Sequence, residues 1–242
     1  MNRRLVASGL LAALLWHGAT PAPAAAVAHT WYVNGSMAAA GTGGSCAAPD
    51  FVDVVAAVED GDVQSGDTLF VCKGLYRLSG PLDLDGANKN LTIVGEGRTK
   101  TTLDGRNLDR VIDATGQDVS LQDLKVIQGR TDGSGGGVKA ANVTLLRVAI
   151  SLNRAAGDGG AVYATGNVTL TDSMVSTNAA TDGDGGGIYA AGNITLTDTL
   201  VVSNSATGSG AGLYAGADIT LDGADIQRNT AAADAGGAYV GD

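Results

Sequence analysis

The second half of the sequence repeats nearly the same line of residues, and this repetition limits the fold more than any other feature. Residues 159–178 are GGAVYATGNVTLTDSMVSTN, residues 185–204 are GGGIYAAGNITLTDTLVVSN, and residues 210–229 are GAGLYAGADITLDGADIQRN. Residues 135–153 are a shortened version. The asparagines that end these lines are spaced 25, 26 and 25 residues apart: Asn153, Asn178, Asn204 and Asn229.

Two apolar columns keep the same spacing and extend the register one unit earlier. They are Val119, Val143, Val168, Ile194 and Ile219, and Leu121, Leu145, Leu170, Leu196 and Leu221. Within a unit, apolar residues alternate with polar ones, as in VTLT at 168–171, and a period of two is typical of a β-strand. Gly, Asn and Asp separate the strands and tolerate the left-handed conformations of sharp corners.

A unit of this length is too short for a propeller blade and lacks the helix of a typical leucine-rich repeat. We therefore predict an all-β protein in which residues 65–242 form a parallel β-helix, with about 25 residues and about three short strands per coil. One coil cannot bury its own apolar face, but a stack of coils builds a continuous core. An aromatic content of 4% and 37 glycines agree with such a narrow core.

The four repeated asparagines are predicted to form an internal corner ladder, because stacked amides can bond to their copies above and below. The functional alternative is a polar binding row. Gly129 occupies the same column one coil earlier, where we expect the ladder to end.

Residues 1–28 form a separate segment with the features of a secretory signal peptide. Arg3 and Arg4 make a basic start, residues 5–16 are an apolar run, and PAPAAAVA offers cleavage after Ala26 or Ala28. The run is shorter than the roughly twenty residues that a membrane-spanning helix needs. We therefore expect a secreted or cell-surface protein with no transmembrane segment in the mature chain.

Residues 29–64 are predicted to form an N-terminal cap with a short amphipathic helix. Asp50 is placed to cap the start of this helix, whose apolar face would close the end of the solenoid: Phe51, Val54, Val55 and Val58. In an oxidising compartment, Cys46 and Cys72 are expected to form a disulfide. A metal pair or a nucleophile is the alternative for these cysteines.

Three segments near the N-terminus carry a resemblance to known proteins. WYVNGS at 31–36, CAAPDFVDVVAAV, and SGDTLFVCKGLYR at 65–77 are similar to the N-terminal module of many secreted bacterial right-handed β-helix proteins, which share the pectate lyase-like fold. The GGAV, GGGI and GAGL lines, each followed by VSTN, VVSN or IQRN, resemble the repeats of the polymorphic outer membrane protein family. The right hand of the helix is implied by this resemblance.

The chain departs from that family in two respects. Val175, Val201 and Ile226 stand where the family repeat usually has Phe, and no membrane barrel follows the repeats in this sequence. Because the sequence stops partway into a further coil, we expect an uncapped or truncated C-terminal end that self-associates or meets another partner.

β-Helices that resemble this one include polysaccharide lyases and glycoside hydrolases, so an enzyme is the alternative to a binding module. Such a lyase needs clustered carboxylates for calcium and a basic residue, and a hydrolase needs a close pair of carboxylates. The loop after each repeated asparagine offers Asp158, Asp182 and Asp184 as a candidate Ca²⁺ site. Ordinary turn chemistry of Asp beside Gly is the competing interpretation.

An outward tyrosine column is the other candidate site: Tyr163, Tyr189, Tyr214 and Tyr239, with Lys139 at its head. The rings are expected either to stack on one another for stability or to bind flat sugar faces of a polysaccharide or cell-surface ligand. A separate edge with Asp123, Arg147 and Asp172 is expected to form exposed ion pairs.

The net charge of −10 argues against binding to nucleic acid or anionic membranes. The sequence therefore favours a secreted or cell-surface, non-catalytic β-helix module with an adhesive or structural role and glycan binding. The alternative is a polysaccharide lyase or glycoside hydrolase.

Overall fold

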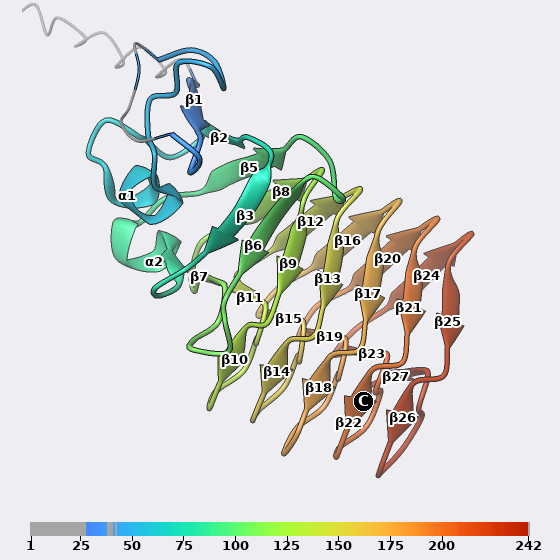
Figure 1. Cartoon of the computed structure of the whole chain (residues 1–242). Helices are drawn as coiled ribbons and strands as arrows, with labels where there is room; N and C mark the ends of the chain where they lie inside the picture. The colour runs from blue at the N-terminus through green and yellow to red at the C-terminus, as the bar shows by residue number, and fades with distance from the viewer. Residues whose placement is uncertain (1–27, 38–40, 42, 242) are drawn as a thin grey trace, which may run out of the picture.

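The computed structural model describes residues 28–37, 41 and 43–241, and these fold into a parallel β-solenoid of about seven turns (Figure 1). The predicted signal peptide lies outside the described residues except for Ala28. Every pairing between named strands is parallel, and each turn of the repeats takes about 25 residues, which confirms the predicted fold class at this level.

Four sheets run along the stack, and we number them I to IV in the order in which a coil passes through them. Sheet I contains β1 (Thr30–Val33), β2 (Thr68–Val71), β5 (Leu91–Gly95), β8 (Val119–Gln122), β12 (Val143–Leu146), β16 (Val168–Thr171), β20 (Ile194–Thr197) and β24 (Ile219–Asp222). Sheet II contains β3 (Gly74–Arg77), β6 (Thr101–Asp104), β9 (Lys125–Ile127), β13 (Ala149–Ser151), β17 (Met174–Ser176), β21 (Leu200–Val202) and β25 (Asp225–Gln227).

Sheet III is built from strands of two residues: β10 (Arg130–Thr131), β14 (Arg154–Ala155), β18 (Ala179–Ala180), β22 (Ser205–Ala206) and β26 (Thr230–Ala231). Sheet IV contains β4 (Leu82–Asp83), β7 (Ile112–Ala114), β11 (Val138–Ala140), β15 (Val162–Ala164), β19 (Ile188–Ala190), β23 (Leu213–Ala215) and β27 (Ala238–Val240). A full coil of the repeats therefore has four strands, whereas the sequence predicted about three. The strands of sheet III have only two residues, so they leave no alternating pattern in the sequence.

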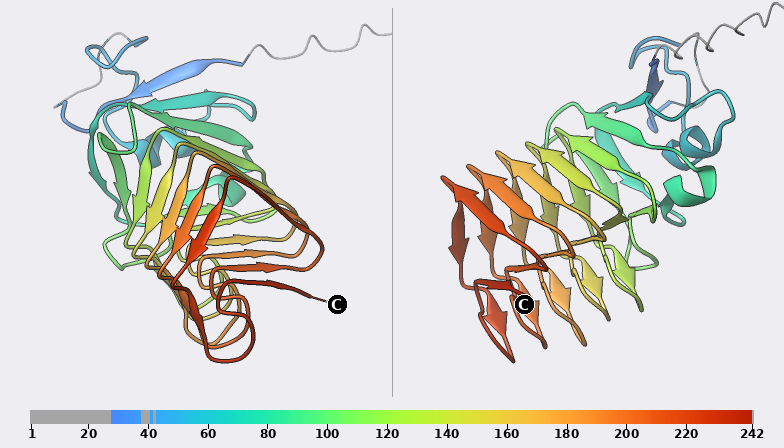
Figure 2. Two further views of the ribbon diagram at one scale, coloured as in Figure 1. Left: turned by 90° about the vertical axis from the view of Figure 1, so that its right-hand side faces the viewer. Right: turned by 180° about the vertical axis from the view of Figure 1, so that it is seen from behind.

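The core is a set of columns in which each residue pairs with its equivalent one coil away. Leu170 pairs with Leu145 on one side and with Leu196 on the other, and all three are at most 1% exposed. Seen close to end-on, the coils follow nearly the same outline (left view of Figure 2). In the last coil no further coil covers this leucine column, and Leu221 is 46% exposed.

Two columns of left-handed residues turn the chain at its sharp corners. One, between sheets I and II, has φ values from 47° to 54° at Asp123, Arg147, Asp172 and Asp198. The other, directly before Gly129 and the four repeated asparagines, has φ values from 52° to 62° at Gln128, Leu152, Thr177, Ser203 and Arg228. Left-handed non-glycine residues cost roughly 1–2 kcal/mol each, so the stacking of the coils must outweigh this strain.

Two short helices lie at the N-terminal end of the stack: α1 (Val54–Glu59) and α2 (Leu84–Ala87) (Figure 1). The N-cap of α1 is Asp53, whose carboxylate accepts hydrogen bonds from the backbone N–H groups of the next turn. The prediction of Asp50 as the cap is wrong, because the Asp50 carboxylate instead accepts the backbone N–H of Tyr32 at 2.8 Å. The Lys89 ammonium donates to the carbonyls of Val58, in the last turn of α1, and of Asp60, its C-cap.

Candidate functional site

The four repeated asparagines line the inside of the corner between sheets II and III. Asn153, Asn178 and Asn204 are each 1% exposed. The Oδ1 of each asparagine accepts both the backbone N–H and the Nδ2 of the asparagine one coil earlier, at 2.9–3.0 Å, from Asn229 back to Asn153. Asn153 Oδ1 accepts the Gly129 N–H at 2.8 Å, so the ladder ends where Gly129 interrupts the column.

Small residues stand opposite the asparagine ladder. A Cβ added at Gly137, Gly187 or Gly212 would lie 2.4–2.6 Å from a carbonyl oxygen of the next coil and 2.9–3.2 Å from the nearest amide atom of the ladder. Ala161 occupies the same column and is fully buried, so a methyl group fits there in one coil. The amides of Asn153, Asn178 and Asn204 are buried, so they hold the corner and offer no surface to a ligand.

The tyrosine column follows the outer surface of sheet IV. Neighbouring ring centroids lie 5.1, 4.9 and 5.3 Å apart from Tyr163 to Tyr239, with interplanar angles of 9°, 9° and 24°. The register pairs Lys139 with Tyr163 at the head of the column. These distances fall in the range of favourable aromatic stacking.

Stacking covers the faces of the two inner rings, those of Tyr189 and Tyr214. Of the two expectations for this column, mutual stacking of the rings is confirmed. Sugar binding by the column stays a prediction. Burial raises the pKa of Tyr189, and the negative charges of Asp158 and Asp184 raise it further. The Tyr189 hydroxyl therefore stays protonated at neutral pH and is a hydrogen-bond donor beside two carboxylates.

Of the three predicted acidic loop residues, Asp158 and Asp184 are linked along the stack. Asp158 Oδ1 accepts the Asp184 N–H at 2.8 Å, and Asp184 Oδ1 accepts the Ser209 N–H. Asp182 is exposed, and its N–H donates to the Ala156 carbonyl. One oxygen each of Asp158 and Asp184 is thus committed to linking the backbones of adjacent coils, as in ordinary turn chemistry.

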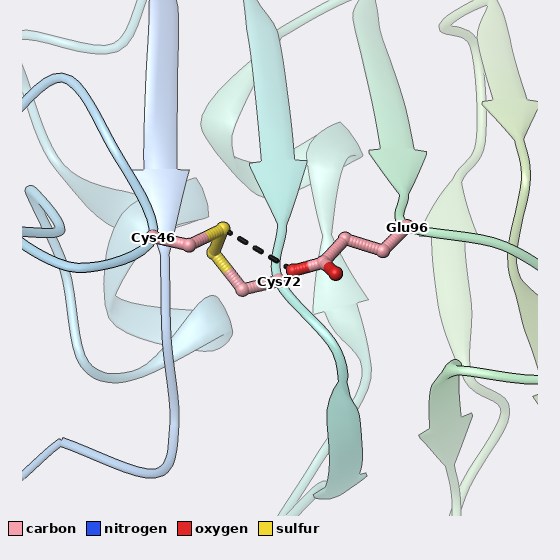
Figure 3. A group of neighbouring side chains, drawn as sticks. All are labelled: Cys46, Cys72 and Glu96. Carbon is pink, nitrogen blue, oxygen red and sulfur yellow. Dashed lines mark hydrogen bonds between the residues drawn. A yellow bond between two sulfur atoms is a disulfide. The ribbon is translucent and has the colours of Figure 1, made fainter.

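In the described part of the chain, one group of three potential ligand atoms lies within 4.8 Å: Cys46, Cys72 and Glu96 (Figure 3). Cys46 and Cys72 form the predicted disulfide, so neither sulfur is a thiolate that could bind a metal. Glu96 accepts the Lys73 N–H at 3.0 Å and touches Cys46 Sγ at 3.5 Å. The cluster is a structural link between the N-terminal segment and the first coils.

The ion pair at the corner between sheets I and II is also structural. Arg147 Nε and Nη2 each lie 2.7 Å from a carboxylate oxygen of Asp123. The hydrogen bond from Arg147 lowers the pKa of Asp123; burial opposes this, while Gln122 and the Arg147 charge add to it. The hydrogen bond to Asp123 raises the pKa of Arg147, and the negative charge of Asp172, one coil further, adds to this effect.

Two outer rows on and beside sheet I were not predicted as rows from the sequence. Each side chain of one row accepts the backbone N–H of the next: Asn90, Asp118, Asn142, Asn167, Asn193 and Asp218. Two residues further on in each coil, the register aligns eight hydroxyl residues: Thr30, Thr68, Thr92, Ser120, Thr144, Thr169, Thr195 and Thr220. The recurring N-x-T pattern was the signal, because it places the same pair at each entry into sheet I.

A hollow of about 500 Å³ lies beside the first strand of sheet III. Arg130 and Asp132 line it together with residues 107–109. Arg130 pairs in register with Arg154, so two like charges are neighbours there. Two carboxylates, those of Asp109 and Asp132, line the hollow together with Arg130.

Comparisons with protein-family models, with curated proteins and with solved structures found no match. None of the helices in the described residues is long and apolar enough to cross a membrane. The fold and its rows of equivalent side chains define the class of the protein, a parallel β-solenoid repeat protein.

Proposed function

We propose that the chain is a secreted or cell-surface, non-catalytic β-solenoid module with an adhesive or structural role, and that it binds glycans along the tyrosine row. The observation that carries this proposal is the continuity of the tyrosine row: the same side chain recurs at four successive coils along one face. A polymer with its own regular repeat can bind such a row at many equivalent points, each of them weak.

Secretion is supported by the signal features of residues 1–28 and by the disulfide, which is typical of oxidising compartments. A right-handed coil is supported by the strong preference of parallel connections for that hand and by the resemblance of the N-terminal segments. A capping role for α1 is supported by Val54, Ala57 and Val58, which belong to the main hydrophobic cluster.

At the other end of the stack, we infer self-association. Leu221 and Val240 in the last coil are 46% and 47% exposed. Strands β24 to β27 each end a sheet, and edge strands of this kind pair readily with another chain.

Glycan contact is proposed at the hydroxyl groups of the tyrosines, with Asp158 and Asp184 as flanking acceptors. Phenol and carboxylate groups together match the donors and acceptors of sugar hydroxyls, whereas the inner ring faces are occupied by stacking. The ligand class is therefore a neutral or amine-bearing polysaccharide, because the net charge of −10 disfavours polyanions.

The test replaces Tyr163 and Tyr189 by Phe, which keeps both rings in the stack and removes their hydroxyl groups. We expect binding to the recognised glycan on an array to weaken roughly tenfold, from the loss of two hydrogen bonds of about 0.7 kcal/mol each. The matched control is Thr169→Val with Thr195→Val on sheet I, which removes two hydroxyls from another face. Unchanged binding by the tyrosine variant, or equal loss in the control, contradicts the proposal.

The competing enzymatic function is tested on the same protein. Incubation with pectate, alginate and related polymers, with and without calcium, should give no unsaturated products and no new reducing ends. Either product would contradict the proposed non-catalytic module and identify the protein as a lyase or a hydrolase.

A further inference from the structure

Asp67 is an almost buried carboxylate at the start of the solenoid, with an exposure of 4%. Its Oδ1 accepts the backbone N–H of His29 at 2.7 Å. Its Oδ2 accepts the indole N–H of Trp31 at 2.8 Å and the backbone N–H of Gln64 at 2.9 Å. Burial opposes ionisation of this group, but the three hydrogen bonds outweigh burial and lower the pKa of Asp67.

The carboxylate has no cation in direct contact among the ion pairs formed by the described residues. The charge of the His29 side chain also lowers the pKa of Asp67, and the Lys89 ammonium donates to the Val58 and Asp60 carbonyls and not to Asp67. Buried charges in proteins are normally paired with an opposite charge. The site therefore holds a negative charge whose closest donor is the backbone nitrogen of His29.

His29 is also the first residue tied into sheet I. Its carbonyl accepts the Thr68 N–H at 2.8 Å, and β1 begins at Thr30. The His29 ring packs against Trp31 with a centroid distance of 4.3 Å. A chain that begins at His29 thus keeps every one of these contacts.

We propose that the Ala28–His29 peptide bond is the signal-peptide processing site, and that the α-ammonium released on His29 is the ion-pair partner of Asp67. This inference rests on the secretion proposed above. Water hydrolyses the C–N bond, Ala28 leaves with the new carboxylate, and His29 keeps the nitrogen as a protonated amine. The small residues Ala26 and Ala28 occupy the positions that a signal peptidase requires.

The alternative cleavage, after Ala26, leaves Val27 and Ala28 ahead of His29 and keeps its nitrogen as a neutral amide. Cleavage after Ala28 instead makes the donor a cation, so a hydrogen bond from a neutral amide to a carboxylate becomes an ion pair without moving the nitrogen. The Coulomb attraction between the two charges then adds to the hydrogen bond. Processing would therefore lock the first strand onto the solenoid only after export.

The first arm of the test is export of the full chain of 242 residues from a bacterial host, followed by intact mass and N-terminal sequencing. We expect a mature protein that begins at His29. A mature protein that begins at Val27, or elsewhere, overturns the processing site but leaves the proposed secretion intact. A chain that is neither exported nor cleaved overturns both.

The second arm compares the exported protein with a form that retains Ala28 as its first residue. We expect the unfolding equilibrium constant to rise roughly fivefold in the longer form. Asp67→Asn should abolish this difference, and the exposed Asp62→Asn should preserve it. Equal stability of the two forms overturns the ion pair, and this comparison decides the matter even if Asp67→Asn does not fold.

Discussion

Replacing Asn178 by Ala removes one rung from the centre of the internal asparagine ladder. The Asn178 side chain is 1% exposed. Its Oδ1 accepts the backbone N–H and the Nδ2 of Asn153, and its Nδ2 donates to Ile150 O, Ser176 O and Asn204 Oδ1, all at 3.0–3.1 Å. The change therefore deletes five hydrogen bonds and leaves the buried Asn153 N–H without its acceptor.

The expected loss of unfolding free energy is about 3–5 kcal/mol. The two bonds that Oδ1 accepts contribute about 1 kcal/mol each and the unsatisfied Asn153 N–H costs about 1–3 kcal/mol, whereas the acceptors of the Nδ2 group retain other partners. Urea unfolding followed by circular dichroism measures this loss as a shift of the midpoint.

The matched control is Asn167→Ala in the outer row, where the exposed Asn167 side chain accepts the Asn193 N–H at 2.8 Å. Water can replace that contact, so the expected loss is below about 1 kcal/mol. If Asn178→Ala is no more destabilising than Asn167→Ala, the internal ladder does not hold the corner and this reasoning is refuted.

Two further predictions concern the ion pair and the disulfide. The pKa of Asp123 is lowered by Arg147, so the pair stabilises the fold above the unfolded pKa of about 3.9, and this contribution is lost as the pH falls through the folded pKa. Arg147→Gln should therefore lower Tm at pH 6 but not at pH 2 in calorimetry; equal shifts would contradict the pairing. Replacing Cys46 and Cys72 by Ser opens a loop of 26 residues and should remove roughly 3.5 kcal/mol of stability. An unchanged urea midpoint would show that the disulfide contributes little.

The repeat period made much of the architecture predictable from the sequence. Once Leu170 and Leu196 are recognised as equivalent, parallel stacking fixes their pairing, and the same register aligns the tyrosines and the asparagines. The disulfide followed from two cysteines in a chain with a secretory signal. The ladders are predictable because their residues recur with the repeat period, and the disulfide is predictable because the chain has only two cysteines.

Contacts made once, between distant segments, were not predictable in the same way. The choice between Asp50 and Asp53 as the cap of α1 depends on Tyr32, whose N–H takes the Asp50 carboxylate. The partners of Asp67 come from segments up to 38 residues away, and no repeat marks them. The mutual stacking of the tyrosine faces depends on ring orientation, which the order of residues does not specify.

The most direct test of the whole account is a methyl NOE spectrum of the folded protein with labelled leucine methyl groups. Equivalent residues of adjacent coils lie about 4.8 Å apart along the stack. We predict strong cross-peaks between Leu145 and Leu170 and between Leu170 and Leu196, with none between Leu145 and Leu196, two coils apart. A spectrum without the Leu170–Leu196 cross-peak would contradict the stacked register on which every row described above depends.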